Sequence, residues 1–147
     1  MEKITAKYLE VKNAILEVKK LTANCCGVHY SKINLNSSYY RDFKVCDLEW
    51  DFFLEEYEKK FNSNLNGLEY ERFFPEIEDQ IAHLKATPKI ILYKLLSIFD
   101  NKYKLELQKL NLSFKKKLEK LTVGDIVLSV LAKKFVERKN IKLVLTK

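Results

Sequence analysis

Hydrophobic residues near the start of the chain recur at alternating spacings of four and three. Ile4, Tyr8, Val11, Ile15 and Val18 follow this rhythm, and mostly polar residues fill the positions between them. Such a stripe lies on one face of an α-helix. The pattern therefore predicts a helix over about residues 3–21, followed by a long structured loop over residues 22–43, where turn-forming residues gather.

The clearest helical pattern covers residues 47–61. Acidic residues fill its first turn, and Lys59 and Lys60 stand in its last turn, as the helix dipole favours. Asp47 is a good residue for the N-cap. We expect a broad buried face made of Trp50, Phe53, Leu54, Tyr57 and Phe61.

A final helix is predicted after Thr122. The Thr122 side chain can cap the amide of Asp125, and the Asp125 carboxylate can reach back toward Thr122, a variant of the capping box. The buried face is then expected to contain Ile126, Val127, Val130, Leu131 and Phe135. The tail over residues 140–147 fits either a short strand or an extension of the helix.

The middle of the chain, residues 77–118, is less regular. A short helix is expected to end near Pro88, because proline lacks an amide hydrogen and restricts the residue before it. A second helix is expected over residues 90–99. Apolar residues over 103–114 alternate as in a small β-hairpin, but they also fit helical spacing, so both alternatives stand.

Composition supports a mainly all-α fold. The 147 residues suit one domain, 1–147, and only three Gly and two Pro are present to make the turns of a β-rich protein. The most apolar stretch, Ile90 to Phe99, is about half the length of a membrane span and is interrupted by Lys94. Three cysteines are too few for a disulfide framework, so we expect a cytoplasmic protein without a transmembrane segment.

The order of these elements resembles an acyl carrier protein. The segments that carry the likeness are Ile33 to Phe43, Leu48 to Phe61 and Leu121 to Val127. The likeness is strongest to a bacterial branch of the acyl-carrier-like superfamily known as a domain of unknown function. Its features are matched by Asp51, Leu65 to Tyr70, Phe73 to Glu76 and Leu121 to Gly124. The resemblance implies a four-helix bundle in which residues 77–118 form an insertion before the last helix.

The resemblance also shows what is missing. A carrier protein holds phosphopantetheine on a serine at the start of its second helix, and counting back from Phe61 places Asp47 at that position. A carboxylate would form a mixed anhydride with phosphate, which water cleaves, and Cys46 would need a shifted register. We therefore expect no prosthetic group and no other cofactor.

Carrier proteins meet their enzymes through this second helix, so the resemblance implies a protein-binding surface there. The predicted partner-binding residues are Asp47, Leu48, Glu49, Asp51, Glu55 and Glu56. The simpler interpretation is a solvated helix face with Asp47 as its cap. No nucleophile–base pair or glycine-rich phosphate loop accompanies these acids, so we expect a protein that is not an enzyme.

Charge gives the alternative function. Residues 1–75 carry 11 basic and 12 acidic side chains, whereas residues 76–147 carry 16 and 8. A basic accessory protein could bind nucleic acid or anionic lipid through residues 102–139, although no DNA-binding motif is present. The residues of this predicted basic patch are Lys115, Lys116, Lys117, Lys133, Lys134 and Arg138.

Two further sites are weaker. Cys25, Cys26 and His29 are poor candidates for a metal site, because adjacent cysteines rarely face one ion, and small buried thiols in a loop are the expected alternative. No metal is therefore expected. The insertion could also pack against the bundle and form a pocket for a small apolar ligand.

Overall fold

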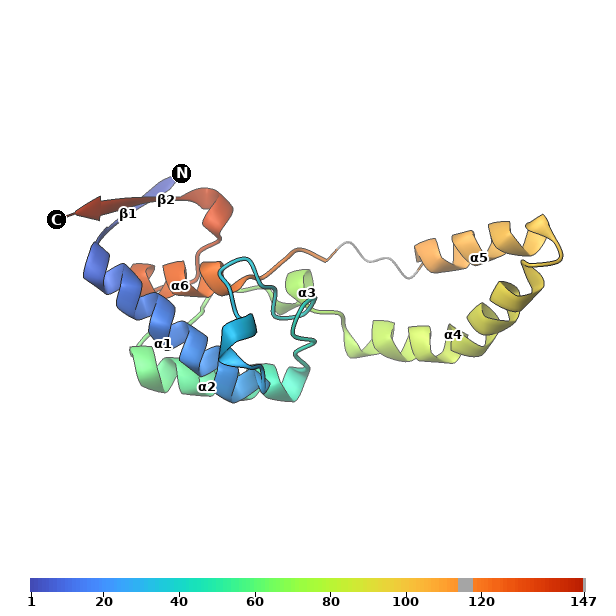
Figure 1. Cartoon of the computed structure of the whole chain (residues 1–147), viewed down its shortest axis with the longest axis horizontal. Helices are drawn as coiled ribbons and strands as arrows, with labels where there is room; N and C mark the ends of the chain where they lie inside the picture. Colours follow the sequence, from blue (N-terminus) through green and yellow to red (C-terminus); the bar gives the residue numbers. More distant parts are fainter. Residues whose placement is uncertain (114–117, 147) are drawn as a thin grey trace. The chain divides into compact units, whose positions relative to one another are not determined.

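The computed structural model describes residues 1–113 and 118–146, and at Ile77 it describes the backbone only. Its secondary structure is mainly helical, as predicted, with one small sheet (Figure 1). The chain divides into two compact units. Residues 1–69 and 120–147 form the first unit, and residues 70–119 form the second. The described part of the predicted insertion lies in the second unit.

A two-stranded parallel sheet joins segments far apart in the sequence. Strand β1 (Glu2–Lys7) pairs with β2 (Ile141–Thr146), in a register that places Ile4 opposite Leu143. The prediction that a helix begins at residue 3 is therefore wrong, and the tail adopts the strand of its two alternatives. In β1 only Ile4 and Ala6 are buried, so alternation overrides the helical spacing there. This register depends on a partner strand far away in the chain.

Helix α1 (Tyr8–Cys26) follows the strand directly. Its buried stripe is shifted from the predicted one: Ala14, Val18, Leu21 and Cys25 are buried, whereas Tyr8 is 67% exposed. The helix ends at Gly27, whose φ of 61° lies in the left-handed region that glycine adopts without strain. The loop therefore starts five residues later than predicted, and it contains one short 3₁₀ turn, η1 (Tyr30–Lys32).

Helix α2 (Asp47–Phe61) has the predicted boundaries. Trp50, Phe53 and Tyr57 are buried, and the loop residue Tyr39 packs edge-on against the first two, with ring centroids 5.3 Å and 5.2 Å away. Aromatic pairs at these separations add to the free energy gained by burial alone. This cluster fixes which side of α2 faces inward.

Helix α6 (Val123–Ala132) is buried on nearly every side, since all residues from Val123 to Val130 are buried. The predicted capping is confirmed: the amide of Asp125 donates to Thr122 Oγ1, and Thr122 donates its own amide to Asp125 Oδ2 over 2.8 Å. After the helix, the 3₁₀ turn η2 (Arg138–Asn140) leads into β2. Leu128 of α6 packs with Ile4 and Ile141, so the sheet covers this helix.

The second unit contains α3 (Tyr70–Phe73), α4 (Ile77–Leu96) and α5 (Asn101–Ser113). Residues 101–113 adopt the helical alternative, so the described part of the insertion contains no β-hairpin. The prediction that Pro88 ends a helix is wrong, because α4 continues through it. Proline removes one amide donor, which leaves the Leu84 carbonyl without its helical partner while the rest of the helix continues. Together α4 and α5 form a helical hairpin (Figure 1).

Candidate functional site

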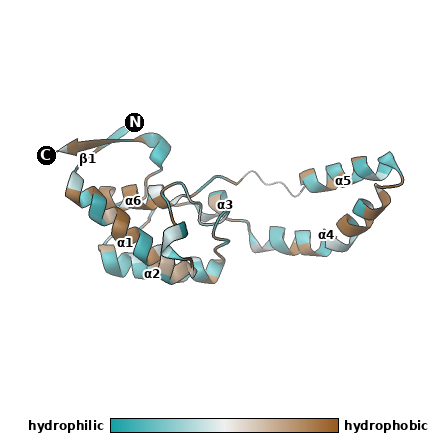
Figure 2. Ribbon diagram, in the orientation of Figure 1, coloured by the Kyte–Doolittle hydropathy of each residue, from teal (hydrophilic) through white to brown (hydrophobic). Residues whose placement is uncertain are grey.

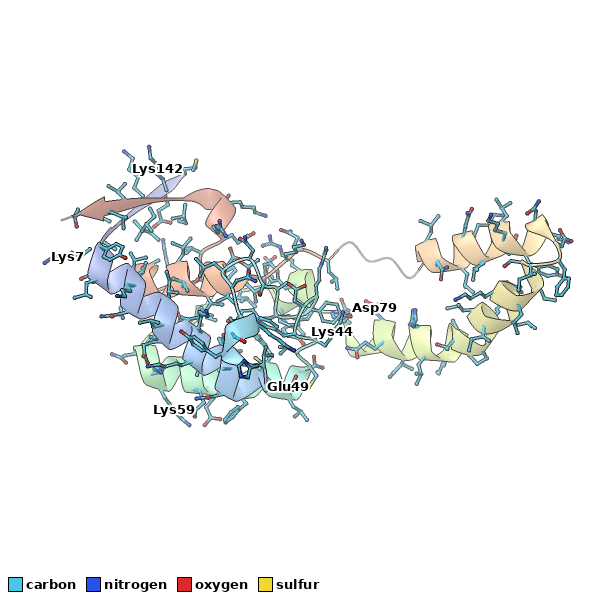
Figure 3. The ribbon with its side chains drawn as sticks, in the orientation of Figure 1. Lys7, Lys44, Glu49, Lys59, Asp79 and Lys142 are labelled. Carbon is cyan, nitrogen blue, oxygen red and sulfur yellow. The ribbon has the colours of Figure 1, made fainter. Side chains whose placement is uncertain are left out.

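The outward side of α2 carries an exposed apolar pair beside acidic residues. Leu48 is 81% exposed and Phe52 is 50% exposed, and the two lie one helical turn apart. Asp51 and Glu55 are exposed on the same side, because residues three and four apart share a helix face. We call Leu48, Asp51, Phe52 and Glu55 the α2 surface. The inward aromatic stripe described above leaves this side facing solvent (Figure 3, where Glu49 and Lys59 mark the two ends of α2).

The first turn of α2 is held by its own capping. Cys46, not Asp47, is the N-cap, and the amide of Cys46 donates to Glu49 Oε2 over 2.9 Å. The predicted cap is therefore wrong by one residue: Asp47 is the first helical residue and is half-buried. Glu49 therefore caps the start of α2, whereas Asp47 contributes a negative charge at the helix N-terminus, where the helix dipole favours one.

Two of the predicted acidic residues form ion pairs within α2. Lys59 Nζ lies 2.7 Å from a Glu55 carboxylate oxygen and 3.0 Å from one of Glu56. These contacts raise the pKa of Lys59, with the hydrogen bond to Glu55 as the largest cause. Because all three side chains are solvated, the pairs contribute little to stability. Lys59 partly neutralises this end of the helix, so the negative charge of the α2 surface is strongest near Asp51.

Helix α2 is tied to α1 by a charged contact. Lys60 Nζ lies 2.6 Å from a carboxylate oxygen of Glu17, and Lys20 lies 2.9 Å from the other oxygen. The hydrogen bonds from Lys20 and then Lys60 lower the pKa of Glu17 to about 2. The buried aromatic cluster orients α2, and this solvated ion pair adds a smaller contact between the two helices.

Of the predicted basic patch, the structure describes Lys133, Lys134 and Arg138, and all three residues are exposed. Lys133 Nζ donates to the Phe61 carbonyl at the end of α2 over 3.1 Å, and Lys134 forms a 2.8 Å ion pair with Glu2. Arg138 donates to the Asn36 side chain over 2.6 Å. These three residues connect elements of the first unit. Lys115, Lys116 and Lys117 lie outside the described residues.

Three comparisons with known proteins found no match to this chain: it matches no protein-family model, no curated protein and no solved structure. The described part of the chain also contains no helix with the length and apolar character needed to span a bilayer.

Phe52 is the site residue that the sequence analysis missed. Its neighbour Phe53 belongs to the buried stripe, and a pair of adjacent phenylalanines suggests at first that both are buried. The usable signal is spacing: Phe52 follows Leu48 by four residues and falls outside the stripe of Trp50, Phe53 and Tyr57.

The two cysteines near the end of α1 belong to the hydrophobic core. Cys25 and Cys26 are buried in the helix and not in a loop as expected, and burial raises the pKa of Cys26 to about 12. His29 is exposed and pairs with Ser31 through Nδ1 over 2.7 Å. Among the described residues, no three His, Cys, Asp or Glu side chains cluster as metal ligands. Cys46, at the start of α2, is the exposed thiol.

One open hollow of about 680 Å³ lies beside the loop between α1 and α2. Its lining comes entirely from residues 27–43 and is largely polar. It is therefore a different feature from the apolar pocket expected at the insertion. The residues that line it are Gly27, Val28, His29, Lys32, Asn34, Asn36, Ser37, Asp42 and Phe43.

Proposed function

We propose that this chain is a carrier-like interaction protein that binds a protein partner through the α2 surface, holds no prosthetic group and catalyses no reaction. One observation carries the proposal: Leu48 and Phe52 are exposed one turn apart, beside Asp51 and Glu55. An exposed apolar pair next to charged residues is typical of a protein-binding surface, since burying it on association releases water from apolar area.

The order and packing of the helices support the carrier-like part of the proposal. α1 packs against both α2 and α6, and the short α3 comes between α2 and α6 in the sequence, as in a carrier bundle. In this interpretation α4 and α5 are the insertion. The finer assignment to an acyl-carrier-like four-helix bundle, and to the bacterial branch of that superfamily, is part of the proposal.

The absence of a prosthetic group follows from the chemistry of Asp47. The residue at the start of α2 offers a carboxylate, which cannot hold phosphopantetheine through a stable phosphodiester. What remains of the carrier function is recognition. A partner suited to the α2 surface presents lysines or arginines around an apolar pocket, because such a surface complements Asp51 and Glu55 while enclosing Phe52.

A photo-crosslinking amino acid at Phe52, introduced into the full chain in its native host, tests this proposal. We expect one discrete protein adduct that disappears when Asp51→Lys and Glu55→Lys are added. The matched control places the same amino acid at Leu9, which is 63% exposed on α1, and we expect no such adduct there. The same adduct from both positions, or one that survives the charge reversals, contradicts the proposal.

The alternative function is binding of nucleic acid or anionic lipid through residues 102–139. It has less support, because Lys133, Lys134 and Arg138 are engaged in contacts within the first unit. Weak retention on heparin that is unchanged by Lys133→Gln, Lys134→Gln and Arg138→Gln would agree with their structural roles. Loss of strong retention in these variants, with the fold intact, would favour the alternative.

A further inference from the structure

Helix α4 has apolar residues on two sides. Ala86, Ile90 and Tyr93 form one row and are half-buried, and the Tyr93 ring lies 5.9 Å from the ring of Tyr103 in α5. The second row follows the alternating three-and-four spacing of a helix face and consists of exposed residues. These residues are Ile81, Leu84, Pro88, Ile91 and Leu95.

The exposed row widens at the end of the helix that leads into α5. Leu92 adds to it, and in the turn that follows Ile98 is 74% exposed and Phe99 is 86% exposed. Figure 2 shows this end of α4 as a hydrophobic stretch. We call Ile91, Leu92, Leu95, Ile98 and Phe99 the hairpin tip. No described residue of α4 or α5 is buried, so the hairpin exposes far more apolar surface than scattered single residues do.

Lysines border the hairpin tip. Residues 85–109 contain six lysines and two acids, a net charge of +4. Lys94, Lys102 and Lys104 are exposed within a few residues of the apolar side chains. The two acids are used locally, since Asp100 accepts the amide of Lys102 over 2.9 Å at the start of α5, and Glu106 pairs with Lys109 over 3.2 Å.

The exposed apolar residues of the hairpin tip and the lysines beside them favour one kind of binding partner over another. A second copy of the chain would bring the same lysines together across a symmetric contact, which like charges oppose. Pro88 also interrupts the amide ladder of α4 in the middle of the exposed row, a poor start for a coiled coil. A surface of anionic lipid complements both features, because it accepts apolar side chains at the acyl boundary while lysine ammonium groups reach the phosphates.

We infer that the hairpin tip is a membrane-contact site that inserts Leu95, Ile98 and Phe99 shallowly into the surface of an anionic bilayer. The hairpin lies on the membrane and does not span it, since α4 is too polar overall to cross. The inference goes beyond the proposed partner binding and uses none of its residues. It shares Lys102, Lys104 and an anionic lipid ligand with the alternative through residues 102–139. It differs in requiring the insertion of Leu95, Ile98 and Phe99, which lie outside that range and which nucleic acid would not bind.

Co-sedimentation of the full chain with vesicles tests the inference. We expect binding to phosphatidylcholine vesicles that contain 30% phosphatidylserine, and little binding to phosphatidylcholine alone. Leu95→Ser with Phe99→Ser, and separately Lys94→Glu with Lys102→Glu, should each weaken binding at least tenfold. The matched controls, Tyr8→Ser with Leu9→Ser and Lys12→Glu with Lys142→Glu, change exposed residues of the first unit and should bind as the wild type does.

A second measurement reports insertion directly. Phe99→Trp adds a fluorophore to a chain whose one natural tryptophan, Trp50, is buried. We expect its emission to shift to shorter wavelength on anionic vesicles and to be quenched by lipids brominated near the headgroup. Equal binding to both vesicle types would overturn the inference, and so would binding that is lost only in the charge variant. It would also be overturned if the chain did not bind vesicles and instead formed a dimer, seen in sedimentation velocity, that Leu95→Ser with Phe99→Ser dissociates.

Discussion

Lys60 of α2 lies 2.6 Å from Glu17 of α1, and Lys20 of α1 binds the other oxygen of the same carboxylate. We expect the stability contributed by these contacts to depend on pH. Hydrogen bonds from Lys20 and Lys60 hold the pKa of Glu17 at about 2, below its ordinary 4.5. A lowered carboxyl pKa contributes stability that is fully present above the unfolded value and is lost as the pH falls through the folded one. The contribution of Glu17 should therefore fade between about pH 4.5 and about pH 2.

Glu17→Gln tests this dependence. We expect the variant to have a lower free energy of unfolding than the wild type at pH 7, and the difference to shrink as the pH approaches 2. Urea unfolding at a series of pH values measures it, with Glu58→Gln, an exposed glutamate of α2, as the control. A difference that stays constant over this interval would show that Glu17 is not held by its lysines.

Alkaline conditions should weaken the core around Tyr39. This side chain is fully buried, and its hydroxyl lies 2.9 Å from Thr22 Oγ1. Burial raises the pKa of Tyr39 well above the ordinary 10, and burial raises that of Tyr57 to about 12. Unfolded tyrosines release their protons near pH 10 while the folded ones keep them, so the free energy of unfolding should fall as the pH rises above 10.

Tyr39→Phe separates the two effects of that hydroxyl. At pH 7 we expect a loss of about 0.5–1.5 kcal/mol, since one buried hydrogen bond is removed. Above pH 10 the stability of the variant should decline less steeply than that of the wild type. Unfolding curves from pH 7 to 11.5 measure both, and Tyr30→Phe is the control at a more exposed tyrosine. Parallel declines in the wild type and in Tyr39→Phe would contradict the assignment.

The Asp125 carboxylate joins the start of α6 to the chain that leads into β2. One oxygen accepts the amide and hydroxyl of Thr122, and the other accepts the amide of Arg138 over 2.6 Å. Asp125→Ala removes the shared acceptor of these part-buried hydrogen bonds, so we expect a loss of about 2–4 kcal/mol. Asp51→Ala, at an exposed position on α2, should change stability by less than about 0.5 kcal/mol. Equal effects in the two variants would rule out this role.

The three cysteines should differ sharply in reactivity. Cys46 is exposed, whereas Cys25 and Cys26 are buried and burial raises the pKa of both thiols. Because the thiolate is the reactive form, we expect one thiol to react quickly with Ellman's reagent in the native protein and three in denaturant. Cys46→Ser should abolish the fast reaction. Rapid reaction of two or three thiols without denaturant would show that the end of α1 is not packed as described.

The parts of the fold that could be predicted are those specified by neighbours in the sequence. The boundaries of α2 follow from its acidic start and its aromatic stripe, and the cap of α6 follows from Thr122 and Asp125, three residues apart. Each signal lies within a few turns of one helix. The identity of the buried aromatic residues Trp50, Phe53 and Tyr57 follows from the same spacing.

The parts that could not be predicted depend on distant contacts. Residues 2–7 have helical spacing but form a strand, because a partner at residues 141–146 pairs with them. Lys133 and Arg138 look like a phosphate-binding surface in the sequence, yet their partners, the Phe61 carbonyl and Asn36, lie 72 and 102 residues away. At the candidate site, the predicted acids Asp51 and Glu55 lie on the exposed side of α2, whereas Glu49 caps the helix instead.

The proposed function depends most on Asp47 at the start of α2. In the carrier-like alignment that we propose, Asp47 stands at the position at which a carrier protein would hold phosphopantetheine, and α2 would then act through its surface alone. Intact-mass spectrometry of the full chain after co-expression with a broad-specificity phosphopantetheinyl transferase, with an ordinary acyl carrier protein as the positive control, is the most direct test. We expect a mass equal to that of the unmodified sequence; a gain equal to the phosphopantetheine arm would contradict the proposed function.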